Sequence, residues 1–236
     1  MCRMLAFMSR EPKPISHYVW EVSRSLQWMS HSGRKAPHRD GFGIAHKNDE
    51  GRMILRTWGQ EELAPLEARQ FADIAGIKTT LLLAHARQAS EGYQEMTSAE
   101  AHPFLEDTLY LAHNGTIRDV HALGGSEGTD TQRLLRWMIA HWKPRSFLGL
   151  RAALMQLLGA IKDYTAIDLL ITEGTHIYAF CCFREQPEYY TMHFRVDETL
   201  VIVASEPLDD GAWQQLRSGE LLQISPDLTV QQDRVV

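Results

Sequence analysis

A cysteine stands directly behind the initiator methionine in the opening segment MCRMLAF. Residue 2 is small, so we expect Met1 to be removed during synthesis, which leaves Cys2 with a thiol and a free α-amine. Such an amine can act as the base that activates the thiol without a separate histidine. The structural alternative is that Cys2 is a small buried hydrophobic residue at the start of a buried strand. Cys2 alone does not decide between them.

Arg87 is the second candidate, because it ends the apolar segment TTLLLAHAR. Alternate residues of a strand share a face, so His85 and Arg87 should point to the same side. The planar guanidinium of an arginine at a strand end is suited to binding a carboxylate. Taken alone, a surface arginine paired with a nearby acid is the simpler interpretation.

The segment TLYLAHNG places Asn114 and Gly115 where an apolar strand becomes a turn. Asn-Gly is a common turn signal, which is the structural interpretation. The functional interpretation is an oxyanion hole, in which the Asn114 side-chain amide and the Gly115 backbone N–H meet a developing negative oxygen. His102, in the segment AHPF, is a candidate to line the same pocket, although a lone histidine is more often structural.

Asp130 opens the predicted helix TDTQRLLRWMIAHW, where it could cap the helix or accept hydrogen bonds from a substrate ammonium. In HRDGFGIAH, Gly41 and Gly43 flank Phe42 within a predicted strand. Glycine inside a strand often marks a close approach of another backbone, and otherwise marks a bulged or twisted hairpin.

Two other patterns are weaker. GGSEG fits the G-x-S-x-G nucleophile pattern with Ser126 as the nucleophile, but that turn should follow a strong strand, and RDVHAL is a poor strand. The chain has 11 histidines but neither H-E-x-x-H nor C-x-x-C, so no metal site is expected. Cys181 and Cys182 lie in an apolar segment and are expected to be packing residues.

Five segments in order resemble the class II glutamine amidotransferases, the glutaminase branch of the N-terminal-nucleophile hydrolases. They are MCR, HRDGFGI, AHARQAS, HPF with AHNGTI, and TDTQ at a helix start. ASEPL near the C-terminus also resembles the stand-alone members, which include bacterial amidotransferases and the γ-glutamyl hydrolase of ergothioneine biosynthesis. Gln132 stands where family members often have an acidic residue.

The resemblance implies a role for each candidate residue. Cys2 resembles the nucleophile that attacks the γ-carbonyl of a glutamyl group, with its α-amine as the base. Asn114 and Gly115 resemble the oxyanion hole, and Arg87 and Asp130 resemble the groups that bind the substrate α-carboxylate and α-amine. A thioester on the cysteine would form and be hydrolysed by water. No cofactor or metal is implied.

The resemblance also implies the fold, an α+β four-layer α-β-β-α sandwich of two antiparallel sheets, with residues 1–236 forming a single amidotransferase domain. Two enzymatic functions stay open: delivery of ammonia from glutamine to a separate synthase subunit, or hydrolysis of a specific γ-glutamyl compound. A third possibility is a catalytically silent γ-glutamyl-binding or regulatory protein.

The elements that must position these residues follow from the residue pattern. We expect a strand at 4–9, a helix at 16–32 capped by Ser16, a hairpin at 41–59 and a short helix at 64–76. Further strands are expected at 79–87 and 108–115, with helices at 129–142 and 146–163. The remainder should form antiparallel strands at 165–174, 176–185, 188–196 and 199–208, with one or two more over 220–236.

Composition limits the class of protein. The chain has 236 residues, of which 44% are hydrophobic and 23% charged, and its net charge is −6. This composition is typical of a globular protein, and the absence of a long basic run disfavours nucleic acid as a partner. Three cysteines, two of them adjacent, argue against a disulfide framework. No apolar stretch reaches membrane-spanning length, so we expect a soluble cytoplasmic protein.

Overall fold

The computed structural model describes residues 2–59, 72–89 and 98–236, and its strands form two antiparallel sheets. One sheet has seven strands in the order β11-β9-β10-β1-β4-β2-β3. Their bounds are Arg3–Pro14 (β1), Phe42–Lys47 (β2), Met53–Trp58 (β3), Lys78–Ala86 (β4), Met192–Val196 (β9), Leu200–Ala204 (β10) and Gln214–Leu216 (β11).

The second sheet has six strands in the order β13-β12-β8-β7-β6-β5. It takes its strands from the middle and the end of the chain. Their bounds are Phe104–Glu106 (β5), Leu109–Ile117 (β6), Tyr164–Thr172 (β7), Ile177–Cys181 (β8), Glu220–Ile224 (β12) and Val230–Arg234 (β13).

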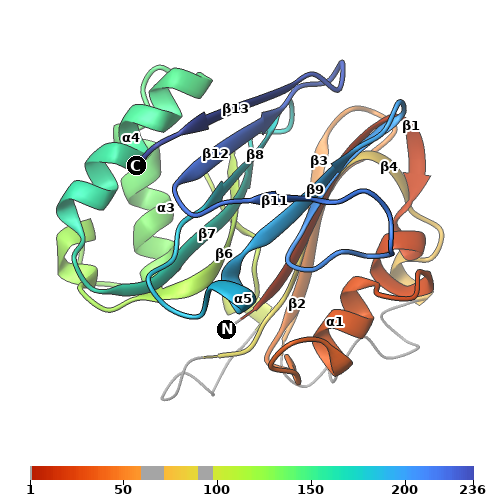
Figure 1. The fold of residues 1–236 in the computed structure, drawn as a ribbon, viewed down its shortest axis with the longest axis horizontal. Helices are drawn as coiled ribbons and strands as arrows, with labels where there is room; N and C mark the ends of the chain where they lie inside the picture. The colour runs from red at the N-terminus through yellow and green to blue at the C-terminus, as the bar shows by residue number, and fades with distance from the viewer. Residues whose placement is uncertain (1, 60–71, 90–97) are drawn as a thin grey trace.

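Helices cover the outer face of each sheet (Figure 1). Helices α3 (Asp130–His141) and α4 (Phe147–Ala160) pack against the six-stranded sheet, while η1 (His17–Glu21) and α1 (Leu26–Ser32) pack against the seven-stranded sheet. Short helices complete the description: η3 (Ser98–Glu100), η4 (Val120–Leu123) and α5 (Pro187–Tyr190). The expected α+β four-layer sandwich is therefore confirmed.

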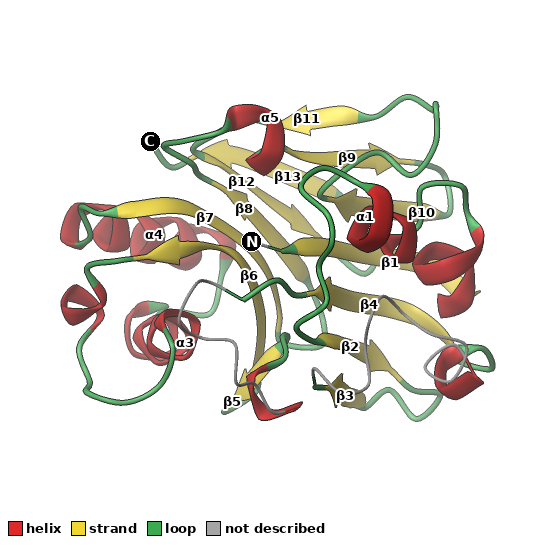
Figure 2. Ribbon diagram, turned by 90° about the horizontal axis from the view of Figure 1, so that it is seen from below, coloured by secondary structure: helices red, strands yellow, loops and turns green. Residues whose placement is uncertain are grey.

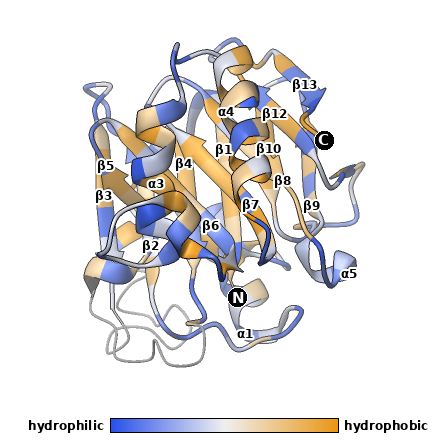
Figure 3. Ribbon diagram, turned by 90° about the vertical axis from the view of Figure 1, so that its left-hand side faces the viewer, coloured by the Kyte–Doolittle hydropathy of each residue, from blue (hydrophilic) through white to orange (hydrophobic). Residues whose placement is uncertain are grey.

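The core between the two sheets follows from strand alternation. In β1, Met4, Ala6 and Met8 belong to the cluster between the sheets, whereas Leu5 and Phe7 pack under the helices of the other face. Both faces of β1 are buried over residues 4–8, which explains the continuous apolar sequence of that half of the strand. Figure 3 shows the largely hydrophobic strands behind the mixed surfaces of α3 and α4.

Two predicted elements are wrong in their extent. The single helix expected at 16–32 is divided into η1 and α1, because the Ser25 side chain accepts a hydrogen bond from the Trp28 N–H and starts a new helix. Ser16, the expected cap, makes no side-chain capping bond. The strand expected at 188–196 begins only at Met192, because Pro187 opens the short helix α5.

The C-terminal strands form hairpins as expected, but the hairpins alternate between the sheets. β7–β8 and β12–β13 belong to the six-stranded sheet, and β9–β10 belongs to the seven-stranded sheet. The helix expected at 64–76 begins outside the described residues. Among the described helices, none has the length and apolar character needed to cross a membrane.

Candidate active site

The candidate residues come from strand ends that meet at one edge of the sandwich. Cys2 precedes β1, Arg87 follows β4, and Asn114 and Gly115 lie near the end of β6 (Figure 2). β1 and β4 are hydrogen-bonded neighbours in one sheet, whereas β6 belongs to the other. The backbone N–H of Cys2 donates to Asn114 Oδ1 at 2.8 Å and so joins the two sheets at this edge.

A small inner pocket of about 30 Å³ gathers the candidates. Cys2 is 6% exposed there, and its thiol donates to the Gln88 carbonyl at 3.9 Å. Asn114 lies next to the pocket through its bond to Cys2. The lining residues are Cys2, Arg87, Gln88, His102, His113, Gly115, Thr129, Asp130 and Thr131. Cys2, Arg87, His102, Asn114, Gly115 and Asp130 thus lie in or beside one pocket.

Arg87 is held by its backbone and leaves part of its guanidinium unpaired. Its N–H donates to the Gly41 carbonyl at 2.8 Å, and its carbonyl accepts from the Asp40 N–H at 2.9 Å. The Asp40 carboxylate also accepts from the Ala89 N–H at 2.7 Å, so the HRDG segment fixes the end of β4. Arg87 Nη1 is buried without a hydrogen-bond partner. A buried unpaired donor is costly, which favours a bound anion here.

Asp130 is the first residue of α3, but it is not the cap. Thr129 caps the helix in a reciprocal capping box with Gln132. Asp130 Oδ2 instead accepts from the Ile117 N–H at 2.9 Å, which ties the helix start to the end of β6. Its Oδ1 accepts from the Thr131 N–H at 2.8 Å. A carboxylate has about four acceptor positions, so Asp130 keeps capacity for a substrate ammonium.

Two glycines are required by close backbone approaches. Gly115 has φ +146°, and a Cβ there would lie 1.9 Å from the Ala166 carbonyl oxygen. A Cβ at Gly43 would lie 2.3 Å from the His102 carbonyl oxygen. The expected close approach is therefore observed at Gly43, where β2 meets the segment that carries His102.

Three buried histidines, His85, His102 and His113, form a hydrogen-bonded group at the inner pocket, which His102 and His113 line. His102 Nδ1 lies 3.1 Å from His85 Nε2 and accepts from the His113 backbone N–H at 3.4 Å. Burial, aided by the nearby charge of Arg87, lowers the pKa of His85 to about 3. Burial also lowers the pKa of His102 well below its usual value. His102 therefore contributes a neutral ring to the pocket wall.

Arg3 and Tyr189 fix the amino-terminal segment, a role of Tyr189 that no sequence pattern indicates. Arg3 is fully buried and its guanidinium lies 3.9 Å from the centroid of the Tyr189 ring. Its Nε lies 3.1 Å from Glu206 Oε1. The Tyr189 hydroxyl donates to the Cys2 carbonyl at 3.1 Å. Tyr189 belongs to the segment expected to be a strand, so its position depends on the unforeseen helix α5.

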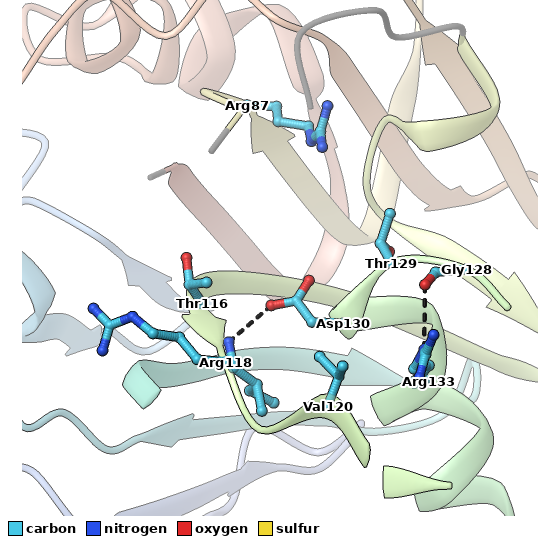
Figure 4. A pocket seen from close by; sticks show the side chains of 9 residues that line it. Arg87, Thr116, Arg118, Val120, Gly128, Thr129, Asp130 and Arg133 are labelled. Carbon is cyan, nitrogen blue, oxygen red and sulfur yellow. Dashed lines mark hydrogen bonds between the residues drawn. The ribbon is translucent and has the colours of Figure 1, made fainter. Parts of the chain in front are cut away.

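A larger outer pocket of about 250 Å³ adjoins the inner one through Arg87, Thr129 and Asp130. Figure 4 shows Arg87 and Asp130 on opposite sides of it. Arg118 and Arg133 add two further cations, of which Arg118 pairs with Asp163 and Glu185, and Arg133 donates to carbonyls of the 125–128 loop. Asp163 and Glu185 offset the charge of Arg118, so Arg87 and Arg133 are the cations of this lining that suit a carboxylate-bearing ligand.

The weaker sequence patterns lie elsewhere. Ser126 is exposed in the loop between η4 and α3, follows no strand, and lines neither pocket. Cys181 and Cys182 are buried, and burial raises the pKa of both thiols. Within residues 2–59, 72–89 and 98–236, no group of three histidine, cysteine or acidic side chains is arranged to hold a metal.

Comparison with known proteins identifies the family. A sequence profile of the class II glutamine amidotransferases matches residues 1–193. The chain belongs to this family. The resemblance found in the MCR, AHARQAS and AHNGTI segments is thereby confirmed at the level of the family.

The relatives of this chain differ from one another in length. An uncharacterized protein of Methanocaldococcus jannaschii is 24% identical over 86% of this chain, and the chain spans 65% of the length of that relative. Escherichia coli YafJ, named as a candidate glutamine amidotransferase, is 22% identical over 93% of this chain and 96% of its own. A class II domain protein from Silicibacter pomeroyi shares the fold, with a TM-score of 0.64 and 18% identity over 99% of both chains.

Proposed function

We propose that this amidotransferase cleaves a γ-glutamyl amide through a thioester on Cys2 and releases glutamate. The observation that carries the proposal is the inner pocket, where a buried cysteine lies with an unpaired guanidinium nitrogen of Arg87 and with the carboxylate of Asp130. A cation and an anion beside a thiol match the charged head of an amino acid whose side chain ends in an amide. We also propose that residues 1–236 act as one catalytic domain.

Removal of Met1 converts the nitrogen of Cys2 into an α-amine. The amine takes the proton from the thiol, and the sulfur attacks the γ-carbonyl carbon. The hydrogen bond from this nitrogen to Asn114 Oδ1 holds it in position for that transfer. The protonated amine then returns its proton to the departing nitrogen, and the C–N bond breaks as the thioester forms. Water, deprotonated by the same amine, hydrolyses the thioester.

Asn114 and Gly115 are proposed to stabilise the tetrahedral oxyanion. Because Asn114 Oδ1 accepts from the Cys2 nitrogen, the Nδ2 group of the same amide is the donor that is left for the oxyanion. Gly115 lines the pocket beside Cys2, and the absence of a side chain lets its backbone approach the reacting carbonyl. Preorganised donors of this kind contribute strongly to acyl transfer.

Arg87 and Asp130 are proposed to bind the α-carboxylate and the α-amine of the glutamyl group. Arg87 follows strand β4 and Asp130 opens helix α3, yet both line the junction of the inner and outer pockets. Two opposite charges fixed on rigid elements orient the amino-acid head, and the side-chain carbonyl then reaches Cys2. His102, as a neutral ring on the same wall, is proposed to shape the space for the side chain. Such positioning supplies a large part of the catalysis of acyl transfer.

Release assays on protein that lacks Met1 test the proposal. We expect glutamate from glutamine or from another γ-glutamyl amide, and no release after Cys2→Ala. If glutamine is the substrate, the ammonia can pass to a separate synthase subunit, and activity should then rise when that partner is added. No release from any γ-glutamyl amide by processed, folded protein would contradict the proposal and favour a silent binding protein.

A further inference from the structure

A third cavity of about 520 Å³ is lined by Tyr189, whose hydroxyl donates to the Cys2 carbonyl. It shares no lining residue with the inner or outer pocket. It lies between α5 and the segment after α1, both close to the amino terminus (Figure 2). We call it the basic pocket. Its lining residues are Arg34, Lys35, Gln186, Pro187, Glu188 and Tyr189.

The backbone that carries the two cations is fixed to the residue next to the nucleophile. Arg3 Nη2 donates to the Arg34 carbonyl at 2.8 Å, and Arg3 Nη1 donates to the Tyr189 carbonyl at 3.3 Å. The Arg34 N–H in turn donates to Glu206 Oε1 at 3.0 Å. Arg3, the residue after Cys2, therefore contacts the backbone of two residues that line the basic pocket, Arg34 and Tyr189.

The side chains of Arg34 and Lys35 are positioned by contacts within the basic pocket. Lys35 has φ +56°, a conformation that a residue with a side chain rarely adopts, and its Nζ lies 5.1 Å from the centroid of the Tyr189 ring. Arg34 Nη1 donates to the Glu188 carbonyl. Uncommon backbone conformations of this kind concentrate at functional sites. The arrangement holds Lys35 over the ring of Tyr189, whose hydroxyl donates to the Cys2 carbonyl, and Arg34 beside Glu188 in the same pocket.

The balance of charge in the basic pocket is positive, although the chain as a whole carries −6. Glu188 is the single acidic residue among the described lining residues, against Arg34 and Lys35. The head-binding charges Arg87 and Asp130 lie in the other two pockets. The glutamyl group thus has its site elsewhere, and the basic pocket is free for another part of the substrate.

We propose that the basic pocket binds the leaving group, and that this leaving group is an amine that carries a carboxylate. The inference rests on the proposed function of Cys2. When the C–N bond breaks, the leaving nitrogen takes the proton that came from the thiol, and its carboxylate stays paired with Arg34 and Lys35. Glutamine, whose leaving group is ammonia, makes no contact with this pocket.

Hydrolysis of matched amides tests the proposal. The γ-glutamyl amides of glycine, β-alanine and 4-aminobutyrate are compared with neutral alkylamides of the same lengths, using protein without Met1. We expect at least one carboxylate-bearing amide to have a kcat/KM about tenfold or more above its neutral counterpart, the effect of a charge-assisted hydrogen bond. In the variant Arg34→Gln/Lys35→Gln this ratio should fall to near one.

A control variant and the opposite outcomes complete the test. Lys47→Gln/Lys78→Gln removes the same charge from a cavity with no shared lining residue, and it should keep the wild-type ratio. Equal rates for charged and neutral amides at every length, or an unchanged ratio in Arg34→Gln/Lys35→Gln, would overturn this inference while leaving the proposed function intact. No hydrolysis of any amide would instead overturn the proposed function, and this inference with it.

Discussion

The proposed glutamyl site and the basic pocket, which lie on two sides of Cys2, are built in different ways. On the glutamyl side, Arg87, Gly115 and Asp130 lie at or near the ends of β4, β6 and α3. The backbones of Arg87 and Gly115 pair with neighbouring segments, and the Asp130 carboxylate accepts from the Ile117 N–H. On the other side, Arg34 and Lys35 are exposed and lie on a connecting segment that follows α1. Rigid elements thus carry the residues that we propose recognise the part common to all γ-glutamyl substrates.

The difference suggests how one fold can serve several substrates. Residues on strand ends and helix starts cannot move without disturbing the sheets, whereas exposed connecting segments accept changes at little cost. Variation in the leaving group can therefore be met by substitutions around the basic pocket alone. The predictions below test whether the two sides respond separately, beginning with the largest effect.

Gly115→Ala should damage the glutamyl side most. The added Cβ would lie 1.9 Å from the Ala166 carbonyl oxygen, at φ +146°. We expect a loss of about 3 kcal/mol or more in the free energy of unfolding, and loss of most activity. Gly159→Ala is the matched control, since a Cβ there meets nothing within 4 Å. It should stabilise α4 by about 0.5–1 kcal/mol. Thermal unfolding measures both, and equal stability of the two variants would contradict the account.

Arg87→Ala and Asp130→Asn should lower kcat/KM for every γ-glutamyl substrate. Each removes a charge-assisted contact to the amino-acid head, which contributes roughly 1.5–3 kcal/mol, or about tenfold to more than a hundredfold. Charged and neutral leaving groups should be affected alike, in contrast to Arg34→Gln/Lys35→Gln. Steady-state kinetics on both kinds of amide checks this. A selective effect on carboxylate-bearing amides would show that the two sides are not separate.

Stability should fall in acid because each side contains a buried neutral histidine. Burial lowers the pKa of His38 and of His85 to about 3, so the unfolded chain takes up protons that the native protein does not. Their stabilising contribution is full above pH 6.5 and is lost as the pH falls from 6.5 toward 3. The slope of the free energy of unfolding against pH should reach about 1.4 kcal/mol per pH unit for each histidine. Urea unfolding from pH 7 to 4 measures it, and an unchanged slope in His38→Gln or His85→Gln would contradict the assignment.

Tyr189→Phe should have the smallest effect. It removes the hydroxyl that donates to the Cys2 carbonyl and contacts His38 Nε2, but it keeps the ring beneath Arg3. One such hydrogen bond contributes about 0.5–1.5 kcal/mol, which corresponds to a two- to tenfold loss of kcat/KM. Kinetics with glutamine and with a carboxylate-bearing amide should show similar losses. A gain in activity with either substrate would be inconsistent with a positioning role for this hydroxyl.

Much of the glutamyl side could be predicted from the sequence, because its residues sit next to regular elements. Apolar periodicity marks β4 and β6, so Arg87 and Asn114 fall at recognisable strand ends. The helix start at Asp130 carries a local signal of its own. Gly115 was expected at a turn, which is wrong, because β6 continues to Ile117 and Gly115 pairs with Ile167 of β7. Their assembly into one pocket depends on pairing between distant strands, which the family resemblance implied and periodicity could not supply.

The residues of the basic pocket could not be predicted from the sequence, for physical reasons. Tyr189 lies in a segment rich in residues that favour strands, and Pro187 with its neighbours forms α5 instead. Lys35 and Arg34 belong to a polar connection whose path is set by Arg3 and Glu206, both distant in sequence. Contacts between a buried arginine and carbonyls that are distant in the chain produce no periodic pattern in the sequence. Exposed connecting segments are accordingly where sequence reasoning was weakest.

The most direct test of the central claim is the site of covalent labelling. Protein without Met1 is treated with an electrophilic glutamine analogue, and the adduct is located by intact mass and peptide mapping. We predict one adduct, on Cys2, and none on Cys181 or Cys182, whose thiols are buried with raised pKa values. Protein that retains Met1, with no α-amine on Cys2, should label far more slowly. Equal labelling of both forms, or an adduct on another cysteine, would contradict an N-terminal nucleophile.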